Sequence, residues 1–516
     1  MNWKVNLALG AASILVLGLL TGVYAGDVPL GIAGEWEWPW ISFEPSIARL
    51  LTAGAGVAAY GWFAARGCRS LEASSPTGRR EAGWVAGLTV AAVAVQVLIA
   101  VGASSPYGLT RWSCIHLLTE ATGYYDVARR EAGPDPWKFL AEYPSWVEAQ
   151  PPGHLAVHPP GLIAGYRGLI ALMDRFGPAA DLLNALTPPD VDQGFREIES
   201  RRNAAIPRTD RAALYLASLI TLLACAGTVA PLYLLARESL PPKPAWIAAA
   251  LWPLSPALNL FQPLPDAAFP LLSATALASA AWAVKRVVKR GQAVKRGQEP
   301  LLLKAIKVPD PFLRPLAIAS GAVMGFGLLF TLALLPVGLI VALVVLTTRS
   351  TSWRGRFQVI GWIGVGCVAV VAVAGLGAGV DLPTVWIWNL RKNAGFYEGS
   401  LRSYLPWVLA NPVELVVAAG LPAALWSLIA LTADRRRAPR AFWSALLVTA
   451  LADLSGGNRG EVARLWMIFL PPLFTAVGVG LDRLGGGGRA VFATIALTGI
   501  QTLGLQSLIQ VVYPEG

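Results

Sequence analysis

Apolar runs long enough to cross a lipid bilayer recur along the whole chain of 516 residues. A helix of about 20 apolar residues spans the hydrocarbon core of a bilayer. Runs of this kind lie at about 5–24, 46–65, 84–103, 212–236, 263–284, 357–380, 412–432, 462–481 and 490–513, with shorter ones at about 244–260 and 441–454. We expect the first run to be a retained span rather than a cleaved signal peptide, because many more spans follow it.

One apolar stretch, residues 315–347, is too long for a single span. It predicts two helices that break near Phe330 and Thr331. With this pair, the chain is expected to fold as an all-α polytopic membrane protein with about 13 transmembrane helices. These helices should form a single transmembrane domain over residues 1–516 and carry a large outer-face loop.

The composition supports this fold class. Hydrophobic residues make up 55% of the chain, charged residues make up 14%, and the mean hydropathy is +0.53. A soluble globular protein has no use for so much apolar surface. The net charge of +11 would suit a nucleic-acid partner, but most Lys and Arg residues cluster in short loops beside the apolar runs. This is the positive-inside pattern, so we expect membrane lipids and no nucleic acid among the partners.

Loop charge also predicts the orientation. The basic loops, which should be cytoplasmic, lie at 66–80, 237–243, 285–307, 349–356, 435–440 and 483–489. Residues 285–314 form a basic cytoplasmic linker. The loop 26–45 carries acidic residues and no Lys or Arg, and it should be external.

Counting spans from these loops places residues 104–211 on the outer face, as one large extracytoplasmic loop. Loops of this length are usually functional, so we expect it to be the catalytic region. The apolar piece at 161–173 then cannot cross the membrane. It should form a juxtamembrane or re-entrant helix that lies against the bundle.

A pair of histidines marks the start of that helix. His154 and His158 are two of the three histidines in the chain. Proline keeps the residue before it extended, and Pro160 can open a helix, so His158 should be held rigidly at the helix mouth. Its role is either structural or in a site that His154 shares.

Two further segments combine acidic, basic and aromatic residues. Thr119 begins a predicted short amphipathic helix that contains Glu120, Tyr124, Tyr125 and Asp126. This helix belongs to the large outer loop.

Near the C-terminus, Arg459, Glu461 and Arg464 lie at the predicted outer end of a late span. An arginine just inside an apolar helix is expensive unless it pairs or binds a ligand. Either Glu461 and Arg464 form an ion pair with only a structural role, or Arg459 or Arg464 binds a phosphate. Asp266, in an outer turn, is a third candidate or a simple helix N-cap.

These segments resemble the GT-C glycosyltransferases, polytopic enzymes that take a sugar from a polyprenyl-phosphate carrier on the outer or lumenal face. The turn from His158 to Gly161 is similar to the His-Pro-Pro turn of protein O-mannosyltransferases and their bacterial relatives. The stretch from Glu120 to Ala128 looks like the first juxtamembrane helix of lipid-A aminoarabinose transferases. Gly460 to Trp466 looks like a late-helix segment of bacterial members.

The resemblance implies an inverting glycosyltransferase in the bacterial plasma membrane, with its active site on the extracytoplasmic face. Its donor would be a polyprenyl-phosphate sugar, and its acceptor a glycan, a lipid or a protein. A carboxylate would act as general base. The family usually carries two adjacent acids in the loop, where this chain has Glu120 and Ala121. The base is therefore Glu120, Asp126 or, if the first external loop is the matching one, Asp27.

Other residues receive roles from the same resemblance. A cation should stabilise the departing phosphate: Arg464, Arg459, or a divalent ion such as Mg²⁺ or Mn²⁺ held by carboxylates and a histidine. His158 would bind the donor phosphate. The acceptor or the sugar would be bound by His154, Tyr124, Tyr125 and Glu461.

Two alternatives are a secondary transporter and an inactive membrane scaffold for polysaccharide assembly. The scarcity of charge within the apolar runs argues against transport.

Overall fold

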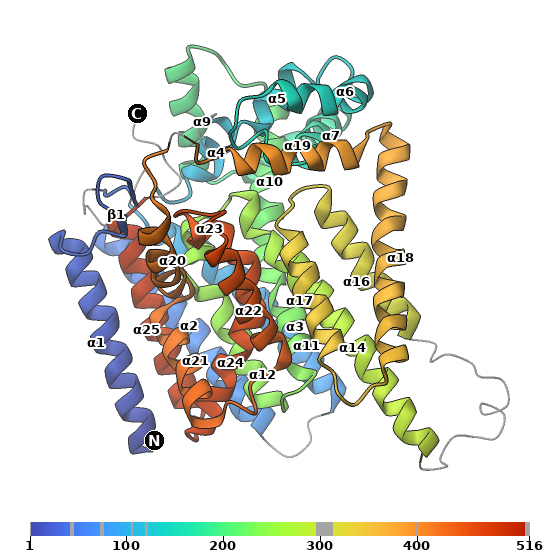
Figure 1. Cartoon of the computed structure of the whole chain (residues 1–516). Helices are drawn as coiled ribbons and strands as arrows, with labels where there is room; N and C mark the ends of the chain where they lie inside the picture. Colours follow the sequence, from blue (N-terminus) through green and yellow to red (C-terminus); the bar gives the residue numbers. More distant parts are fainter. Residues whose placement is uncertain are drawn as a thin grey trace.

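The computed structural model describes residues 2–41, 46–72, 77–104, 107–118, 122–295, 313–398 and 400–510, with the backbone alone at 286–295 and 313. Helices account for almost all regular structure, and β1 (Gly31–Ile32) and β2 (Trp36–Glu37) form one small antiparallel hairpin (Figure 1). The expectation of an almost entirely α-helical protein is confirmed. Of the expected basic linker, residues 296–312 lie outside the described part.

Most of the apolar helices pack side by side as a bundle (Figure 1). They are α1 (Trp3–Ala25), α2 (Ile47–Glu72), α3 (Gly78–Gly102), α10 (Arg208–Gly227), α11 (Val229–Arg237), α14 (Phe269–Lys295), α16 (Leu313–Leu328), α17 (Leu334–Leu346), α18 (Trp353–Ala378), α20 (Tyr404–Ala419), α21 (Leu421–Asp434), α22 (Arg440–Leu454), α24 (Leu470–Arg483) and α25 (Gly488–Leu508). The stretch 315–347 folds as α16 and α17, with the break where the sequence predicted it.

Several expected spans are not single straight helices. The run near 244–260 divides into α12 (Pro242–Leu251), η1 (Trp252–Leu254) and α13 (Pro256–Leu260). The run at 462–481 divides into α23 (Val462–Leu465), η3 (Met467–Phe469) and α24. Prolines explain the restarts, because proline lacks the N–H that a continuing helix needs and is accepted in a first turn. The run at 412–432 bends by 108° at Gly420, whose φ is +103°.

By length and composition, six helices of the described chain could cross a membrane, or seven if the bent pair α20–α21 is one span. They include α1, α3, α18 and α25. The count of about 13 spans that the sequence predicted is not confirmed. Apolar helices of this number and length make the chain an integral membrane protein.

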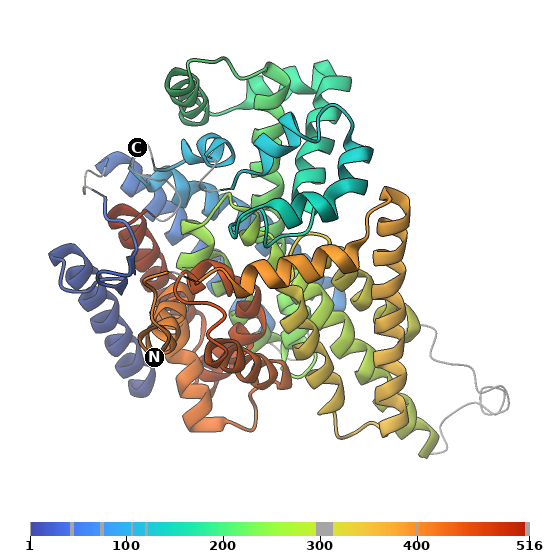
Figure 2. The ribbon, with the colours of Figure 1, turned by 45° about the horizontal axis from the view of Figure 1, so that its top comes forward.

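The segment 104–211 folds into short helices at the end of the bundle opposite the N-terminus (Figures 1 and 2). These are α4 (Arg111–Leu117), α5 (Tyr124–Arg130), α6 (Pro136–Ala149), α7 (Gly161–Arg175), α8 (Gly177–Leu186) and α9 (Pro189–Arg202). We call this the loop end. The helix α7, which covers the apolar piece at 161–173, lies there and packs on α5 and α10. The helix α19 (Leu382–Ala394) lies across the same end (Figure 1).

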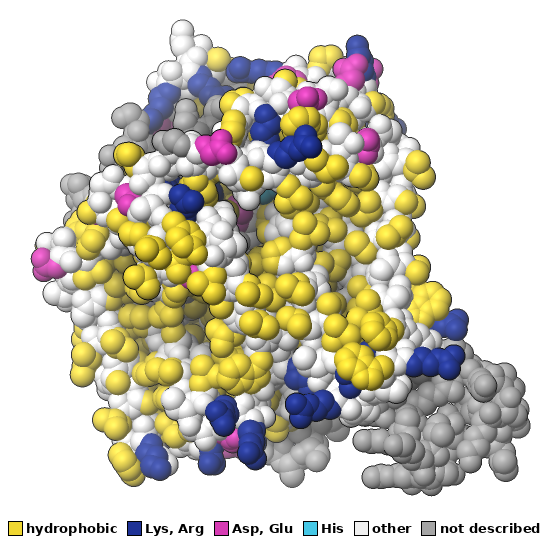
Figure 3. Space-filling model, in the orientation of Figure 1, with side chains coloured by type: hydrophobic (Ala, Val, Ile, Leu, Met, Phe, Trp, Pro, Cys, Tyr) yellow, Lys and Arg dark blue, Asp and Glu magenta, His cyan; other side chains and the backbone are white. Residues whose placement is uncertain are grey.

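Surface charge differs between the two ends. Figure 3 shows a broad band of hydrophobic side chains across the middle of this face, with Lys and Arg at both ends of the molecule. Acidic side chains appear mainly at the loop end (Figure 3). This distribution is compatible with the positive-inside rule if the loop end faces outward.

Cysteine labelling tests this orientation. Ser145 and Gln193, both exposed at the loop end, should label with a membrane-impermeant thiol reagent on intact cells after replacement by cysteine. A cysteine at exposed Ser350, in an expected cytoplasmic loop, should label only after lysis. The native thiols of Cys68, Cys114 and Cys225 are buried, and Cys367→Ala removes the half-buried one. Opposite labelling of Ser145 and Gln193 would make α7 a true span.

Candidate functional site

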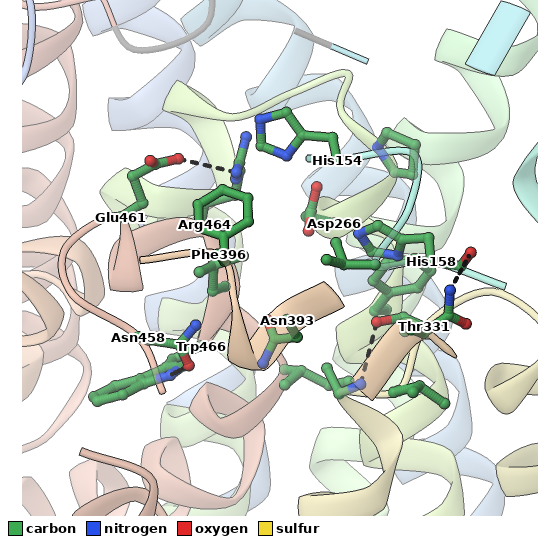
Figure 4. A pocket seen from close by; sticks show the side chains of 18 of the residues that line it. His154, His158, Asp266, Thr331, Asn393, Phe396, Asn458, Glu461, Arg464 and Trp466 are labelled. Carbon is green, nitrogen blue, oxygen red and sulfur yellow. Dashed lines mark hydrogen bonds and ion pairs between the residues drawn. The ribbon is translucent and has the colours of Figure 1, made fainter. Parts of the chain in front are cut away.

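Segments that are far apart in the sequence meet in one cavity of about 320 Å³ between the loop end and the bundle. Its wall is built from residues near 122–124, 154–162, 264–269, 331–336, 389–397 and 452–469. These include the histidine pair, the outer turn with Asp266 and the segment from Gly460 to Trp466 (Figure 4). We call it the central cavity.

The histidine turn is fixed to the bundle by its backbone. Gly161 donates its N–H to the carbonyl of Leu329 at 2.9 Å, in the break between α16 and α17. A Cβ atom at Gly161 would lie 2.3 Å from that same oxygen, so only glycine allows the approach. Asn389 of α19 donates to the carbonyl of His158 at 3.2 Å, and the hydroxyl of Tyr143 donates to the same carbonyl at 3.0 Å.

This anchoring sets the chemical form of His158. Its Nδ1 lies 3.1 Å from the carbonyl oxygen of Phe330. A carbonyl only accepts, so Nδ1 carries the proton and, in the neutral ring, Nε2 is left as an acceptor. Burial lowers the pKa of His158, and the charge of Asp266 opposes that shift only in part. Burial, helped by Arg464, lowers the pKa of His154 to about 4. Both rings are therefore neutral at pH 7.

The C-terminal segment brings an ion cluster to the opposite wall. Glu461 accepts from Arg464 at 2.9 Å and from Arg402 at 3.0 Å. Burial works to raise the pKa of Glu461, but the two arginines outweigh it and hold the pKa below its ordinary value. Two guanidinium groups share one carboxylate, so the cluster keeps a net positive charge. The Nε of Arg464 is buried and has no hydrogen-bond partner in the described chain.

Local strain and side-chain contacts shape this segment. Gly460 and Glu461 have φ values of +84° and +58°. A Cβ at Gly460 would lie 2.8 Å from the ring of Trp407, so glycine is required there. Asn411 of α20 accepts from the N–H of Gly460 at 3.1 Å. Arg464 thus lies in the separate four-residue helix α23, a correction to the expectation that it sits one turn into a continuous span.

Asp266 enters the cavity from η2 (Pro265–Ala267). Figure 4 shows its carboxylate beside His154 and His158. This carboxylate makes no hydrogen bond or ion pair with any residue that the structure describes, and it does not act as an N-cap. The turn before it is held by the buried Arg111, which donates to the carbonyl of Leu260 at 2.9 Å and to Gln510 at 3.3 Å.

The structure brings some of the sequence candidates together and separates others. The central cavity collects His154, His158, Tyr124, Glu461 and Arg464, all of which line it. Thr122 lines it as well, whereas Glu120, two residues earlier in the sequence, lies outside the described residues.

Four other candidates lie elsewhere. Tyr125 and Asp126 line a different cavity of about 540 Å³, where Tyr125 donates to Asp210 at 2.5 Å and Asp126 pairs with Arg202 at 3.3 Å. Arg459 does not line the central cavity; it donates to the carbonyl of Arg402 at 2.8 Å. Asp27 is exposed beyond the end of α1 and lines none of these cavities.

The sequence offered Asp266 as a third candidate and did not indicate Arg402 or Asn393. Asp266 carried a signal, since it is an acid in a proline-rich turn at the expected outer face. Arg402 and Asn393 carried none, because they approach the cavity through α19 and the loop that follows it. That approach is tertiary and leaves no local pattern.

A divalent metal ion would need several His, Cys, Asp or Glu side chains close together. The described residues contain no group of three or more His, Cys, Asp and Glu side chains that could hold one. His154, His158 and Asp266 therefore do not form such a metal-binding group in the described chain. The expected Mg²⁺ or Mn²⁺ stays a prediction.

Comparison with solved structures finds the Archaeoglobus fulgidus oligosaccharyltransferase in several forms. The form with Zn and sulfate has a TM-score of 0.36 and 14% identity, and covers 73% of this chain and 49% of that one. The form with an inhibitory peptide and a dolichol-phosphate has a TM-score of 0.32 and 14% identity, and covers 79% and 50%. The form tethered to an acceptor peptide has a TM-score of 0.30 and 15% identity, and covers 80% and 49%.

The chain therefore spans about half the length of the structures it matches. No family model matches the chain, and no curated protein matches it.

Proposed function

We propose that the protein is a glycosyltransferase that moves a sugar from a polyprenyl-phosphate carrier to an acceptor hydroxyl. One observation carries the proposal. The central cavity, of about 320 Å³, is lined by an unpaired carboxylate, Asp266, and by Arg464, whose partner Glu461 is also held by Arg402. A base and a phosphate-binding cation are the two groups that this transfer requires.

The carboxylate is assigned first. Two carboxylates of the described chain line the cavity, Asp266 and Glu461. Glu461 is held by two arginines, and its lowered pKa makes it a weak base. Asp266 has no such partner, so it takes the base role that the sequence assigned to Glu120, Asp126 or Asp27.

The reaction follows from these positions. The acceptor hydroxyl oxygen attacks the anomeric carbon, and its proton passes to the carboxylate of Asp266. The bond between that carbon and the phosphate oxygen breaks, and the polyprenyl phosphate leaves with the negative charge. A single displacement inverts the anomeric configuration.

Arg464 stabilises the leaving phosphate. Its Nη2 is engaged by Glu461, and its Nε has no hydrogen-bond partner in the described chain. A hydrogen bond between ionised partners is stronger than a neutral one, and enclosure strengthens it further. The interaction between Arg464 and the phosphate becomes stronger as the phosphate gains negative charge in the transition state. Only interactions that strengthen in this way accelerate the chemical step.

The neutral side chains of the cavity suit the sugar. His154, Asn393 and Tyr124 place donors, acceptors and ring faces in the same wall. A neutral histidine can accept a hydrogen bond from a sugar hydroxyl, through Nε2 in the case of His158. The acceptor would be a glycan, a lipid or a protein, and the active site would face outward in a bacterial plasma membrane.

Transfer from a short-chain polyprenyl-phosphate sugar tests the proposal directly. Purified protein should release polyprenyl phosphate and form a glycosylated product when supplied with cell-envelope acceptors. Protein with Asp266→Asn should not. Adding a chelator in the same assay decides whether a divalent ion takes part. If donor is consumed by neither form, and neither form binds it, the scaffold alternative stands; uptake of a solute into vesicles would favour the transporter.

A further inference from the structure

A second basic cavity lies at the far ends of two helices that also build the central cavity. The helix α17 lines the central cavity through Leu335 and this second cavity through Leu343. The helix α22, which packs on α17, lines the central cavity through Ala452 and the second through Arg440. The second cavity, of about 700 Å³, is therefore at the end opposite the loop end. We call it the arginine cavity.

Among the described residues, four arginines and no acidic residue line the arginine cavity: Arg349, Arg435, Arg436 and Arg440. Arg440 donates to the hydroxyl of Thr348 at 3.0 Å. The other three make no ion pair or side-chain hydrogen bond within the described chain. The neighbouring Arg437 differs, because it lies 3.9 Å from both Asp434 and Asp482.

The start of α22 adds to the positive charge. The helix has 15 residues, begins at Arg440, has Pro439 as its N-cap, and has neither a side-chain cap nor an acid in its first turn. The first N–H groups of a helix lack internal partners and carry the positive end of the helix dipole. Arginine side chains and a helix N-terminus therefore converge on one cavity.

An apolar surface continues from the rim of this cavity toward the loop end. Trp443 and Leu447 of α22 line the cavity and are 41% and 50% exposed. Farther along the same two helices, Leu339 and Leu451 are also exposed. A ligand that uses both surfaces has an anionic head and an apolar tail. Free phosphate would use the arginines alone.

We propose that the arginine cavity binds the phosphate headgroup of an anionic phospholipid, with an acyl chain lying along α17 and α22. Basic pockets between membrane helices at the cytoplasmic end suit such headgroups. Trp443 stands where an interfacial tryptophan is expected, between headgroup and hydrocarbon. The site is separate from the central cavity and does not depend on the function proposed for it.

Lipid binding to the purified full-length protein tests the site. The probe is a short-chain phosphatidylglycerol, compared with phosphatidylcholine of the same chain length and with inorganic phosphate as competitor. Bound lipid is counted by native mass spectrometry. Each arginine near a membrane surface contributes about fivefold to the attraction of an anionic lipid. The variant R349Q/R435Q/R436Q should therefore bind phosphatidylglycerol on the order of a hundredfold more weakly.

The matched control removes the same charge elsewhere in the expected cytoplasmic loops. The variant R66Q/R79Q/R489Q replaces three exposed arginines that do not line the arginine cavity and should lose only a few-fold. The variant R349K/R435K/R436K keeps the charge and should retain most of the binding.

Three results would contradict the proposed lipid site. Equal losses in the two glutamine variants would overturn the proposal, because binding would follow net charge alone. Displacement of the lipid by equimolar phosphate would also overturn it and point to a free-anion site. Binding of phosphatidylcholine as tight as that of phosphatidylglycerol would leave the arginines without a role.

Discussion

Replacing Asp266 by asparagine should abolish sugar transfer while leaving the protein folded. The amide keeps the shape of the side chain but cannot take the proton of the acceptor hydroxyl, and loss of a general base typically lowers the rate by about a hundredfold or more. Asp266 makes no hydrogen bond or ion pair in the described chain, so the substitution removes no contact that supports the fold. Donor binding should remain near that of the unaltered protein.

The comparison set contains the acids that the sequence suggested. Asp126→Asn and Asp27→Asn should retain transfer, because neither residue lines the central cavity. The rate of product formation at saturating donor, with gel-filtration profiles as the folding check, separates the cases. If Asp266→Asn is active and Glu120→Gln is dead, the base is Glu120 and the assignment of Asp266 is wrong.

Replacing Arg464 by alanine should weaken transfer on the order of tenfold to a hundredfold, the value of a hydrogen bond to a charged group. The loss should appear both in the apparent KM for the donor and in kcat, since the phosphate gains charge as it leaves. Arg464→Lys should recover only part of it, because an ammonium group lacks the planar fork of the guanidinium. Glu461 keeps Arg402 as a partner at 3.0 Å, so the variant leaves no buried carboxylate unpaired.

Arg459→Ala is the natural control for this experiment. Arg459 donates to the carbonyl of Arg402 and lies 5.3 Å from the ring centroid of Tyr397, outside the lining of the central cavity. Its loss should affect donor use less than the loss of Arg464. A Glu461→Gln, Arg464→Gln double variant that is stable and fully active would show that the pair only balances itself, and would remove Arg464 from the phosphate site.

The sequence by itself determined the fold class and identified most of the residues that line the candidate site. Apolar runs follow from local composition, so the helices and the break between α16 and α17 could be predicted from residues 315–347 alone. The His-Pro-Pro turn and the Glu461–Arg464 spacing were also visible, because proline geometry and helical neighbours are local properties. Span number was harder, since prolines and Gly420 divide several apolar runs into shorter or bent helices.

Only the tertiary structure decided which of these residues share a cavity. The hydrogen bond from Gly161 to Leu329 joins the histidine turn to the break between α16 and α17, which is far away in the sequence. Arg402 reaches Glu461 across 59 positions, and no sequence pattern marks that approach. Asp266 and Asp126 look alike as isolated acids. Packing leaves the first unpaired in the central cavity and pairs the second with Arg202 in another. Side-chain partners, not residue type, separate the candidate base from an acid that only supports the fold.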